Sequence, residues 1–508
     1  MPVERISVVE LGLNQIKITI ADLEGEGFVP LYNEVQNLHF GLDNGGDCFL
    51  KKPQIEEIIK HLKNFKRLCE YYNVQKTYSY AFFMGANKPK NLFSFFDEVF
   101  ATSGFRFSIP TDEGILFSIY SSAINTLDAP KSVLLEVNTD YVAILQYSRR
   151  NILEQKLMGF SPLSLLDKFS ISDYESSKER FDAIKDYVKK EIKKLNLAKV
   201  EEGEPTFVCA GKPIVDLANM IKKLKKYPLD LVHGYIASQK DADIVADQIS
   251  QMELDKTKAL KGLDGGRADV FCAVLMIEQA LAEVIGAEEF IVSGYSMTEG
   301  LLFGIANPST LEKPVSDCLG SSLEVQMNYY DRNDAKHNNQ VYELALLLYK
   351  QLKVLHKLPR GYVKILRAAA MLHDSGKRVN PIDHAKHSFY VILTSELYGL
   401  THREKLLAAY VASLHEGGEI SLASWVSNKD IVTEEDLVAV KKLGIILRLA
   451  EYFDASKTNA IVDITCDVLG DSVIMKTVTE GDNSYELQQS AKLGRAFEKF
   501  FKKRLEVL

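Results

Sequence analysis

Hydrophobic and polar residues alternate along residues 5–22, and β-branched residues gather on both sides of a turn that contains Gly12. Alternation with a period of two is typical of a strand, so this stretch predicts a two-stranded hairpin, followed by a third strand near 28–35. Residues 53–72 have apolar side chains at helical spacing after a proline suited to the first turn, which predicts an amphipathic helix. An extended segment, a helix and a short strand are expected next, at 77–85, 91–104 and 105–109.

The opening pattern returns at residues 132–158, where a strand, a tight polar turn and two further strands are predicted. The two β-rich stretches lie about 125 residues apart and each precedes predicted helices, which indicates a duplicated αβ domain. An actin-like ATPase or a sugar kinase would have such a repeat, although other α/β proteins share it.

The clearest boundary lies between residues 305 and 325, where Pro, Ser and Asn replace periodic apolar residues. Helical periods dominate from there to about residue 457, and seven of the ten histidines lie between 337 and 415. A predicted hairpin and a basic helix over 492–505 end the sequence. We therefore expect two αβ lobes, a helical domain and a short C-terminal segment, at 1–125, 126–310, 311–460 and 461–508.

The composition predicts a globular protein with several cores. Of 508 residues, 46% are apolar and 26% are charged, and a domain typically has roughly 100 to 200 residues. A net charge of -8 gives no reason to expect a nucleic-acid partner. The six cysteines are scattered, acidic residues interrupt the apolar N-terminus, and no run reaches ~18 apolar residues. We expect a cytoplasmic protein with reduced thiols and no membrane association.

Six short motifs occur in the order and with the spacing of a known family. They are RADV (267–270), VSGYSMTEGLLFGI (292–305), DAKHNNQV (334–341), AAAMLHDSGK (368–377), DHAKHSFYVI (383–392) and LRLAEYFDAS (447–456). The second resembles the run VSG-x-GLREGLL of the exopolyphosphatase and guanosine pentaphosphate phosphohydrolase family, and the chain is identified as similar to this family over nearly its whole length. The resemblance implies an α/β fold with two actin-like (ribonuclease H-like) lobes, followed by an all-α histidine-aspartate (HD) domain with a small β-containing C-terminal segment.

The resemblance also implies a cleft between the lobes, where a terminal phosphoanhydride of polyphosphate or guanosine pentaphosphate is hydrolysed with Mg2+. Glycine-rich hairpin turns hold phosphate in such a cleft, because a backbone without Cβ can approach the oxygens and offer N–H donors. A carboxylate orients the attacking water. The implied catalytic residues are Glu10, Glu113 and Glu136, and the implied phosphate-binding residues are Gly12, Asn14, Asn138, Thr139 and Gly211.

Several of these positions depart from the family pattern. The first turn reads ELGLNQ (10–15) where the family has DLGSNS, and the second reads EVNTDYV (136–142) where the family has DIGGGST. Asp140 would place a negative charge where phosphate should lie, and Gly114 stands where the general-base Glu is expected. Hydroxyl donors, glycines and the base each contribute to phosphoryl transfer, so we expect a cleft that is weak or inactive in catalysis.

The helical domain keeps more of its pattern. HD-type phosphohydrolases, which this part resembles, hold a divalent metal with a His, an adjacent His-Asp pair and a later acid, and the metal activates the attacking water. The corresponding residues are His337, His373, Asp374 and Glu451, and a second metal could use His387 and His415, with His384 as a spare. Lys377 matches a phosphate-facing lysine. The expected metal is Mn2+ or Mg2+, although a histidine on an apolar helix is more often a core residue.

Three functions remain open from the sequence. The first is phosphoanhydride hydrolysis in the actin-like cleft, in a homodimer built through the helical domain. The second is an HD-type metal phosphohydrolase that acts on a phosphorylated nucleotide, and the third is a non-catalytic protein that binds such a nucleotide. Arg448 and Asp454 have a plainer interpretation as residues that each pair locally on a helix surface.

Overall fold

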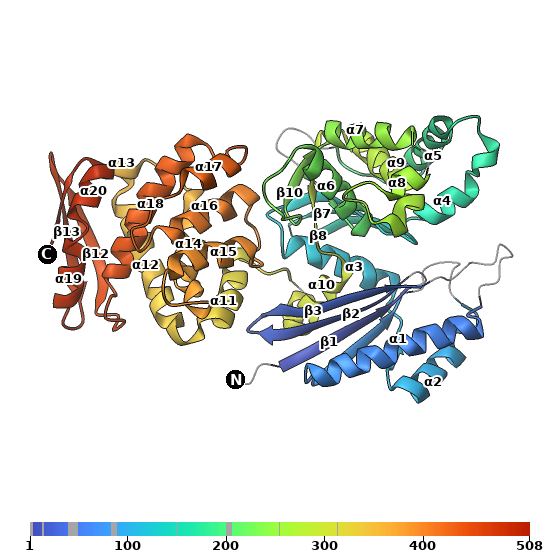
Figure 1. The fold of residues 1–508 in the computed structure, drawn as a ribbon, viewed down its shortest axis with the longest axis horizontal. Helices are drawn as coiled ribbons and strands as arrows, with labels where there is room; N and C mark the ends of the chain where they lie inside the picture. The colour runs from blue at the N-terminus through green and yellow to red at the C-terminus, as the bar shows by residue number, and fades with distance from the viewer. Residues whose placement is uncertain are drawn as a thin grey trace. The chain divides into compact units, whose positions relative to one another are not determined.

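The computed structural model describes residues 4–12, 15–38, 49–82, 89–149, 151–199, 206–252, 254–311 and 313–508. Its contacts divide the chain into two compact units, Met1–Ser316 and Asp317–Leu508 (Figure 1). The finer division into two lobes at residue 125 and a separate segment from residue 461 stays a prediction. No helix within the described ranges is both long and apolar enough to span a membrane.

Unit 1 opens with a five-stranded sheet in the order β3-β2-β1-β4-β5. Its strands are β1 (Glu4–Leu11), β2 (Gln15–Glu24), β3 (Gly27–Asn37), β4 (Lys76–Ala81) and β5 (Phe107–Ser108). The predicted hairpin and third strand are confirmed, because β1 pairs antiparallel with β2 and β2 with β3. In the hairpin, Glu10 lies opposite Lys17, which brings a carboxylate and an ammonium to the same end of the sheet.

Helices α1 (Lys52–Tyr71) and α2 (Leu92–Ser103) cover one face of this sheet (Figure 1). Helix α1 follows the predicted pattern, with Pro53 in its first turn. Its apolar positions are buried, and they are Ile55, Ile58, Ile59, Leu62 and Phe65. The predicted helix and short strand also form, as α2 and β5, and the first part of the predicted extended segment forms β4. The end of that segment, residues 83–85, lies outside the described residues.

A six-stranded sheet follows, in the order β10-β11-β9-β6-β7-β8. Its strands are β6 (Lys131–Val137), β7 (Val142–Ser148), β8 (Asn151–Leu157), β9 (Thr206–Ala210), β10 (Tyr235–Ser238) and β11 (Glu289–Val292). As in the first sheet, an antiparallel run of three strands begins with the central strand, which pairs in parallel with the next strand after a crossover. The structure therefore has the repeat that the two hairpin patterns predicted.

Helices complete unit 1. They are α3 (Asp112–Ile124), α4 (Pro162–Lys168), α5 (Ser177–Ile192), α6 (Lys212–Leu224), α7 (Gln239–Ser250), α8 (Leu254–Lys258), α9 (Ala268–Ile285) and α10 (Met297–Ala306). Helix α3 packs on the second sheet and against α10, and α10 also contacts β3 of the first sheet. This packing brings the first turn of α10 to the ends of both hairpins.

Unit 2 begins with helices: α11 (Cys318–Asp331), α12 (Ala335–Gln351), α13 (Lys353–His356), α14 (Tyr362–Leu372), α15 (His384–Thr394), α16 (His402–Ser413), α17 (Leu422–Asn428) and α18 (Glu434–Tyr452). It ends with β12 (Ile461–Val468), β13 (Ser472–Thr479), α19 (Ser484–Ala491), α20 (Gly494–Phe501) and β14 (Arg504–Val507). The predicted hairpin forms, and its residues share one core with the helices.

The last predicted helix is shorter than expected. Lys502 adopts a left-handed conformation that ends α20, and the chain continues as β14, which pairs in parallel with β13. The prediction of one helix over 492–505 was wrong at its end, because pairing with a distant strand outweighs the local helical pattern. The result is a three-stranded sheet in the order β12-β13-β14.

Candidate functional site

A cavity of about 100 Å3 in unit 1 lies where the two hairpins, the start of α6 and the first turn of α10 meet; we call it the cleft. Four of the predicted phosphate-binding residues line it, and they are Gly12, Asn138, Thr139 and Gly211. The predicted catalytic residue Glu10 also lines it. Asn14, the remaining predicted phosphate ligand of the hairpins, lies outside the described residues.

Glu10 is held by a hydroxyl group of α10. The Thr298 hydroxyl donates to Oε1 of Glu10 and accepts a hydrogen bond from Nζ of Lys17 at 2.6 Å, while Lys17 Nζ lies 3.8 Å from the Glu10 carboxylate. Burial raises the pKa of Glu10, although Lys17 and Thr298 act against this shift. The carboxylate is thus engaged by internal partners.

Glu136 is held in the same way from the second hairpin. Its Oε1 accepts hydrogen bonds from the hydroxyls of Ser296 and Tyr141 and from the Asn138 amide at 3.1 Å. The side chain is fully buried, and burial raises its pKa to about 7. Its Oε2 is buried without a hydrogen-bond partner among the described residues. Ser296, just before α10, and Thr298, in its first turn, thus bind the two glutamates of the hairpins.

The cleft has charges of both signs. Lys17, Lys212 and Arg267 line it, and Arg267 is already paired with Asp216 at 2.8 and 3.0 Å. Asp140 lines it as well, and burial raises the pKa of this carboxyl to about 6. The cations could attract a phosphate group, whereas Asp140 would repel it once ionised.

Glu113 does not line the cleft. It is exposed in the first turn of α3, where its charge complements the helix dipole. Its catalytic role stays a prediction that rests on the family resemblance alone.

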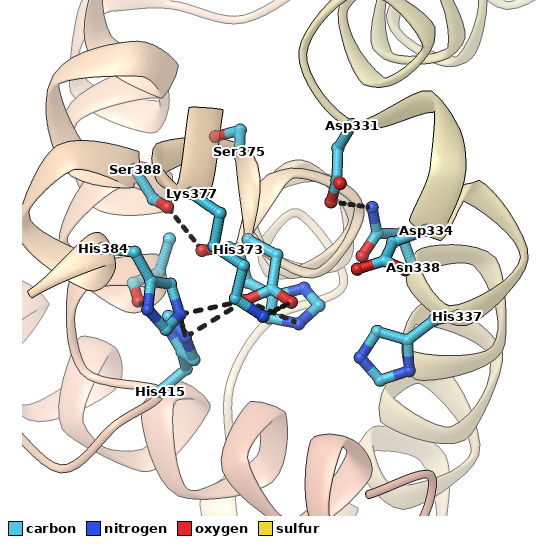
Figure 2. Close-up of polar contacts among 12 residues, drawn as sticks. Asp331, Asp334, His337, Asn338, His373, Ser375, Lys377, His384, Ser388 and His415 are labelled. Carbon is cyan, nitrogen blue, oxygen red and sulfur yellow. Dashed lines mark hydrogen bonds and ion pairs between the residues drawn. The ribbon is translucent and has the colours of Figure 1, made fainter. Parts of the chain in front are cut away.

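A second group of functional side chains lies inside unit 2. We call His337, His373, Asp374, His384 and His415 the histidine cluster (Figure 2). Ligand atoms of His337, His373 and Asp374 lie within 4.8 Å of one another, and so do those of Asp374, His384 and His415. Figure 2 shows His384 and His415 side by side, with His337 across the site from them. All five side chains are buried.

The five residues of the cluster come from four places in the chain. His337 lies in the first turn of α12, His373 follows α14, and Asp374 precedes the short 3-10 helix Ser375–Arg378. His384 opens α15, and His415 follows α16. Most residues of the cluster thus lie at or next to helix ends, and their side chains point into the cluster.

The Nδ1 atom of each histidine has a partner outside the cluster. His373 and His415 bond to the carbonyls of Ala370 at 2.7 Å and Ala412 at 2.6 Å, and His384 lies 3.2 Å from the Pro381 carbonyl. His337 Nδ1 lies 2.7 Å from Oδ2 of Asp454. Such partners orient an imidazole so that Nε2 can bind a metal.

The Nε2 atoms meet around Asp374. Oδ1 of Asp374 lies 3.0 Å from Nε2 of His384 and 3.6 Å from Nε2 of both His373 and His415. His373 Nε2 is buried with no hydrogen-bond partner among the described residues. Burial lowers the pKa of His373 to about 4 and that of His415 to about 3, so both rings are neutral near pH 7 and have a lone pair for a cation.

Glu451 and Lys377 complete the electrostatics of the cluster. Burial, with the nearby charge of Asp374, raises the pKa of Glu451 to about 8, and its Oε2 has no hydrogen-bond partner in the described part of the chain. The Lys377 ammonium contacts Oδ2 of Asp374. Burial alone would raise the pKa of Asp374, but His373, His384 and Lys377 together hold it far below its usual range.

The structure brings His384 into the cluster and leaves His387 out of it. His387 lies one turn further along α15 and is only part-buried. The sequence predicted His387 as a ligand and His384 as the spare. The structure places His384, and not His387, among the clustered side chains, and the role of either as a metal ligand stays a prediction.

Three residues beside the cluster were missed or misread from the sequence. Asp454 is buried at 1% exposure and binds His337, so the interpretation of Asp454 as a surface residue was wrong. Asp331, the last residue of α11, and Asp334, just before α12, come near Asp374. The three-residue spacing of Glu451 and Asp454 was a signal, because residues three apart on a helix share a face.

Two α/β halves that repeat one strand order and meet at a cleft define a protein of the actin-like class, here continued by a mainly helical unit. Residues 162–308 match the model of the Ppx/GppA phosphatase family, and residues 323–492 match the model of Ppx/GppA phosphatase, domain III. The two matches together span more than half of the chain. The chain belongs to the Ppx/GppA phosphatase family.

Curated proteins that are similar to this chain share modest sequence identity with it. The guanosine-5'-triphosphate,3'-diphosphate pyrophosphatase of Aeromonas hydrophila is 29% identical over 222 residues, which is 43% of this chain and 42% of that protein. The bifunctional 3-dehydroquinate synthase/phosphatase of Fusobacterium nucleatum is 20% identical over 312 residues, covering 59% of this chain and 46% of that protein. The chain thus matches less than half the length of either relative.

Solved structures share the fold. A Ppx/GppA family member from Aquifex aeolicus has a TM-score of 0.52 and 20% identity, covering 60% of this chain and 98% of that one. An exopolyphosphatase from Cytophaga hutchinsonii has a TM-score of 0.51 and 18% identity, covering 60% of this chain and 98% of that one. At these identities, the likeness concerns the architecture.

Proposed function

We propose that this chain is a metal-dependent phosphohydrolase whose reactive centre is the histidine cluster of unit 2, an HD-type site. The observation that carries the proposal is the meeting of the histidine Nε2 atoms around Asp374, with their Nδ1 atoms bound elsewhere. A buried imidazole nitrogen without a partner costs free energy unless something binds it. A divalent cation held by His337, His373 and Asp374 would give the unpartnered His373 Nε2 a partner.

The donor set fits a divalent metal. Neutral imidazoles and carboxylates are ligands for such ions, and a set rich in imidazole suits a transition metal such as Mn2+ better than Mg2+. Bound there, the metal would supply Lewis acidity and activate water for attack on phosphorus. Either His337, His373 and Asp374 or Asp374, His384 and His415 would hold it, with Glu451 as the further ligand that the family resemblance implies. Asp454 would keep the His337 ring oriented.

The proposed substrate is a phosphorylated guanosine nucleotide or polyphosphate. The Aeromonas relative bears the name of a guanosine-5'-triphosphate,3'-diphosphate pyrophosphatase, and a Cytophaga neighbour that of an exopolyphosphatase. A phosphate ester or anhydride is the substrate class that a metal and Lys377 would polarise together. A homodimer built through unit 2 remains part of the proposal.

Hydrolysis of a phosphoanhydride in the cleft of unit 1, with Mg2+, is the second candidate. It is favoured by the convergence of Glu10, Gly12, Asn138, Thr139 and Gly211, beside the two lysines that line the cleft. Against it, the glutamates are engaged by Thr298 and Ser296. A cleft that binds nucleotide without turnover would fit the same contacts.

The first test is metal retention. Full-length protein loaded with Mn2+ and dialysed should retain the metal, and His373→Ala should lose it because a ligand is removed. His387→Ala is the matched control, since this histidine lies outside the cluster, and it should retain the metal. Elemental analysis by mass spectrometry measures the content, and circular dichroism checks that each variant is folded. A metal-free wild type would overturn the proposal.

The second test is phosphate release from polyphosphate and from guanosine pentaphosphate. His373→Ala should lose activity by at least about a hundredfold, while Glu10→Gln and Glu113→Gln should keep it. The opposite result, with activity lost in Glu10→Gln and kept in His373→Ala, would move the reaction to the cleft. Activity absent from every variant and from the wild type would favour the binding function.

A further inference from the structure

Arg448 is fixed in position beside the histidine cluster. Its Nε and Nη2 donate to the Tyr452 hydroxyl at 3.1 and 2.9 Å, and its guanidinium carbon lies 5.3 Å from the centre of the Tyr452 ring. Tyr452 lies one turn later on the same helix, α18. Two hydrogen bonds to one hydroxyl and a ring contact hold the guanidinium without neutralising it.

The chain beyond His415 is shaped to admit this guanidinium. A Cβ at Gly417 would lie 2.5 Å from Arg448 Nη1 and 2.9 Å from its guanidinium carbon. Gly417 also has a φ of 91°, a backbone angle that residues with a Cβ rarely adopt. Gly417 therefore lets Arg448 lie against the backbone just two residues after His415.

Arg448 has no carboxylate partner within 4.0 Å in the ranges that the structure describes. Two other arginines of unit 2 differ in this respect, because Arg367 is paired with Asp317 and Arg403 with Asp436. Acidic side chains are close in sequence, since Glu416 precedes Gly417 and Glu451 lies one turn from Arg448 on α18. The guanidinium is nonetheless left with unused donors.

The charge of Arg448 acts on Glu451, beside the cluster. It is among the groups that act on the Glu451 carboxyl, together with Asp374, Lys377 and Glu416. The other cation of this set, Lys377, is bound to Asp374. Of these two cations in the described part of the chain, Arg448 is the one that is not paired with a carboxylate.

We propose that Arg448 binds the phosphate group of the substrate at the histidine cluster, an inference that rests on the proposed function. A planar guanidinium with spare N–H donors matches two phosphate oxygens at once, which an ammonium cannot do. The ligand class is a terminal phosphate, as in a phosphorylated nucleotide. Arg448 would position this group and would not bind the metal.

The test compares phosphate affinity and metal content in the Mn2+-loaded, full-length protein. Isothermal titration with inorganic phosphate should give an affinity at least about tenfold weaker in Arg448→Ala than in the wild type. Arg448→Lys should recover only part of the lost phosphate affinity, because lysine keeps the charge but lacks the planar pair of N–H donors. Arg367→Ala is the control, since its guanidinium is already paired, and it should bind phosphate as the wild type does.

The metal content separates the possible outcomes. Retained metal with weakened phosphate binding supports the inference. Loss of metal in Arg448→Ala would overturn it, because Arg448 would then act by holding the chain at His415. Unchanged phosphate affinity, or no phosphate binding by the wild type, would also overturn it. A wild type that binds phosphate through Arg448 but retains no metal would contradict only the proposed metal chemistry.

Discussion

At the scale of single residues, Glu136 shows how the cleft differs from a cleft built for anions. Its carboxyl is fully buried and bound by three donors through one oxygen, while the other oxygen has no hydrogen-bond partner in the described ranges. Burial raises its pKa from 4.5 to about 7. Near neutral pH the protein therefore loses stability by burying this charge.

The first prediction concerns this group. Below pH 4.5 the carboxyl is protonated in both the folded and the unfolded state, so its ionisation does not lower the free energy of unfolding there. Between pH 4.5 and about 7 the unfolded state ionises first, and stability falls until the folded pKa is passed. The free energy of unfolding of Glu136→Gln should thus match that of the wild type near pH 4.5. At pH 8 it should be higher than that of the wild type by up to about 3 kcal/mol.

Denaturant unfolding at several pH values measures this difference. Glu98→Gln, at an exposed position on α2, is the control and should leave the pH dependence unchanged. If Glu136→Gln had the same free energy of unfolding as the wild type at every pH, the carboxyl would be solvated in the folded protein.

At the scale of elements, the contact between α3 and α10 brings the motif on α10 to the cleft. Gly300 on α10 faces α3 so closely that a Cβ would lie 1.9 Å from the carbonyl oxygen of Ser118. Only a glycine lets the two helix backbones approach this far. The first turn of α10 can then present Ser296 and Thr298 to Glu136 and Glu10.

Gly300→Ala should therefore be destabilising. The methyl group must push the two helices apart, and overpacking of this kind costs about 1 to 3 kcal/mol. Gly159→Ala is the matched control, because nothing lies within 4 Å of a Cβ there, and its effect should stay within about 0.5 kcal/mol. Thermal unfolding of both variants provides the comparison, and equal melting temperatures would contradict the close contact.

At the scale of the whole molecule, the chain has two compact units with separate cores. The cleft belongs to Met1–Ser316, and the histidine cluster belongs to Asp317–Leu508. A ligand that binds only the native form of one unit stabilises that unit by mass action. The two sites can therefore be distinguished by their effects on unfolding.

Calorimetry of the full chain should show two transitions. Adding Mn2+ at about 100 times its dissociation constant should stabilise one of them by about 2.7 kcal/mol, and a chelator should reverse the shift. The shifted transition should be the one that Gly300→Ala leaves in place, because the proposed metal site lies in unit 2. A shift of the Gly300-sensitive transition would instead place the metal in unit 1.

Much of the fold followed from the sequence. The two hairpins, helix α1 and the repeated β-rich pattern were predicted from periodicity, because strand and helix periods are local properties that adjacent residues express. Strand β14 was not predicted, because it forms only by pairing with β13, about 30 residues earlier in the chain.

The sequence by itself also determined which candidate ligands the chain carries, since the order of His337, His373, Asp374 and His415 predicted a metal-binding set. Tertiary structure alone decided that His384 joins this set and that Asp454 is buried against His337. It also decided that Thr298 engages Glu10, a contact between residues 288 positions apart. Spacing along a helix relates only residues three or four apart, whereas the packing of distant helices and hairpins selects which polar groups meet.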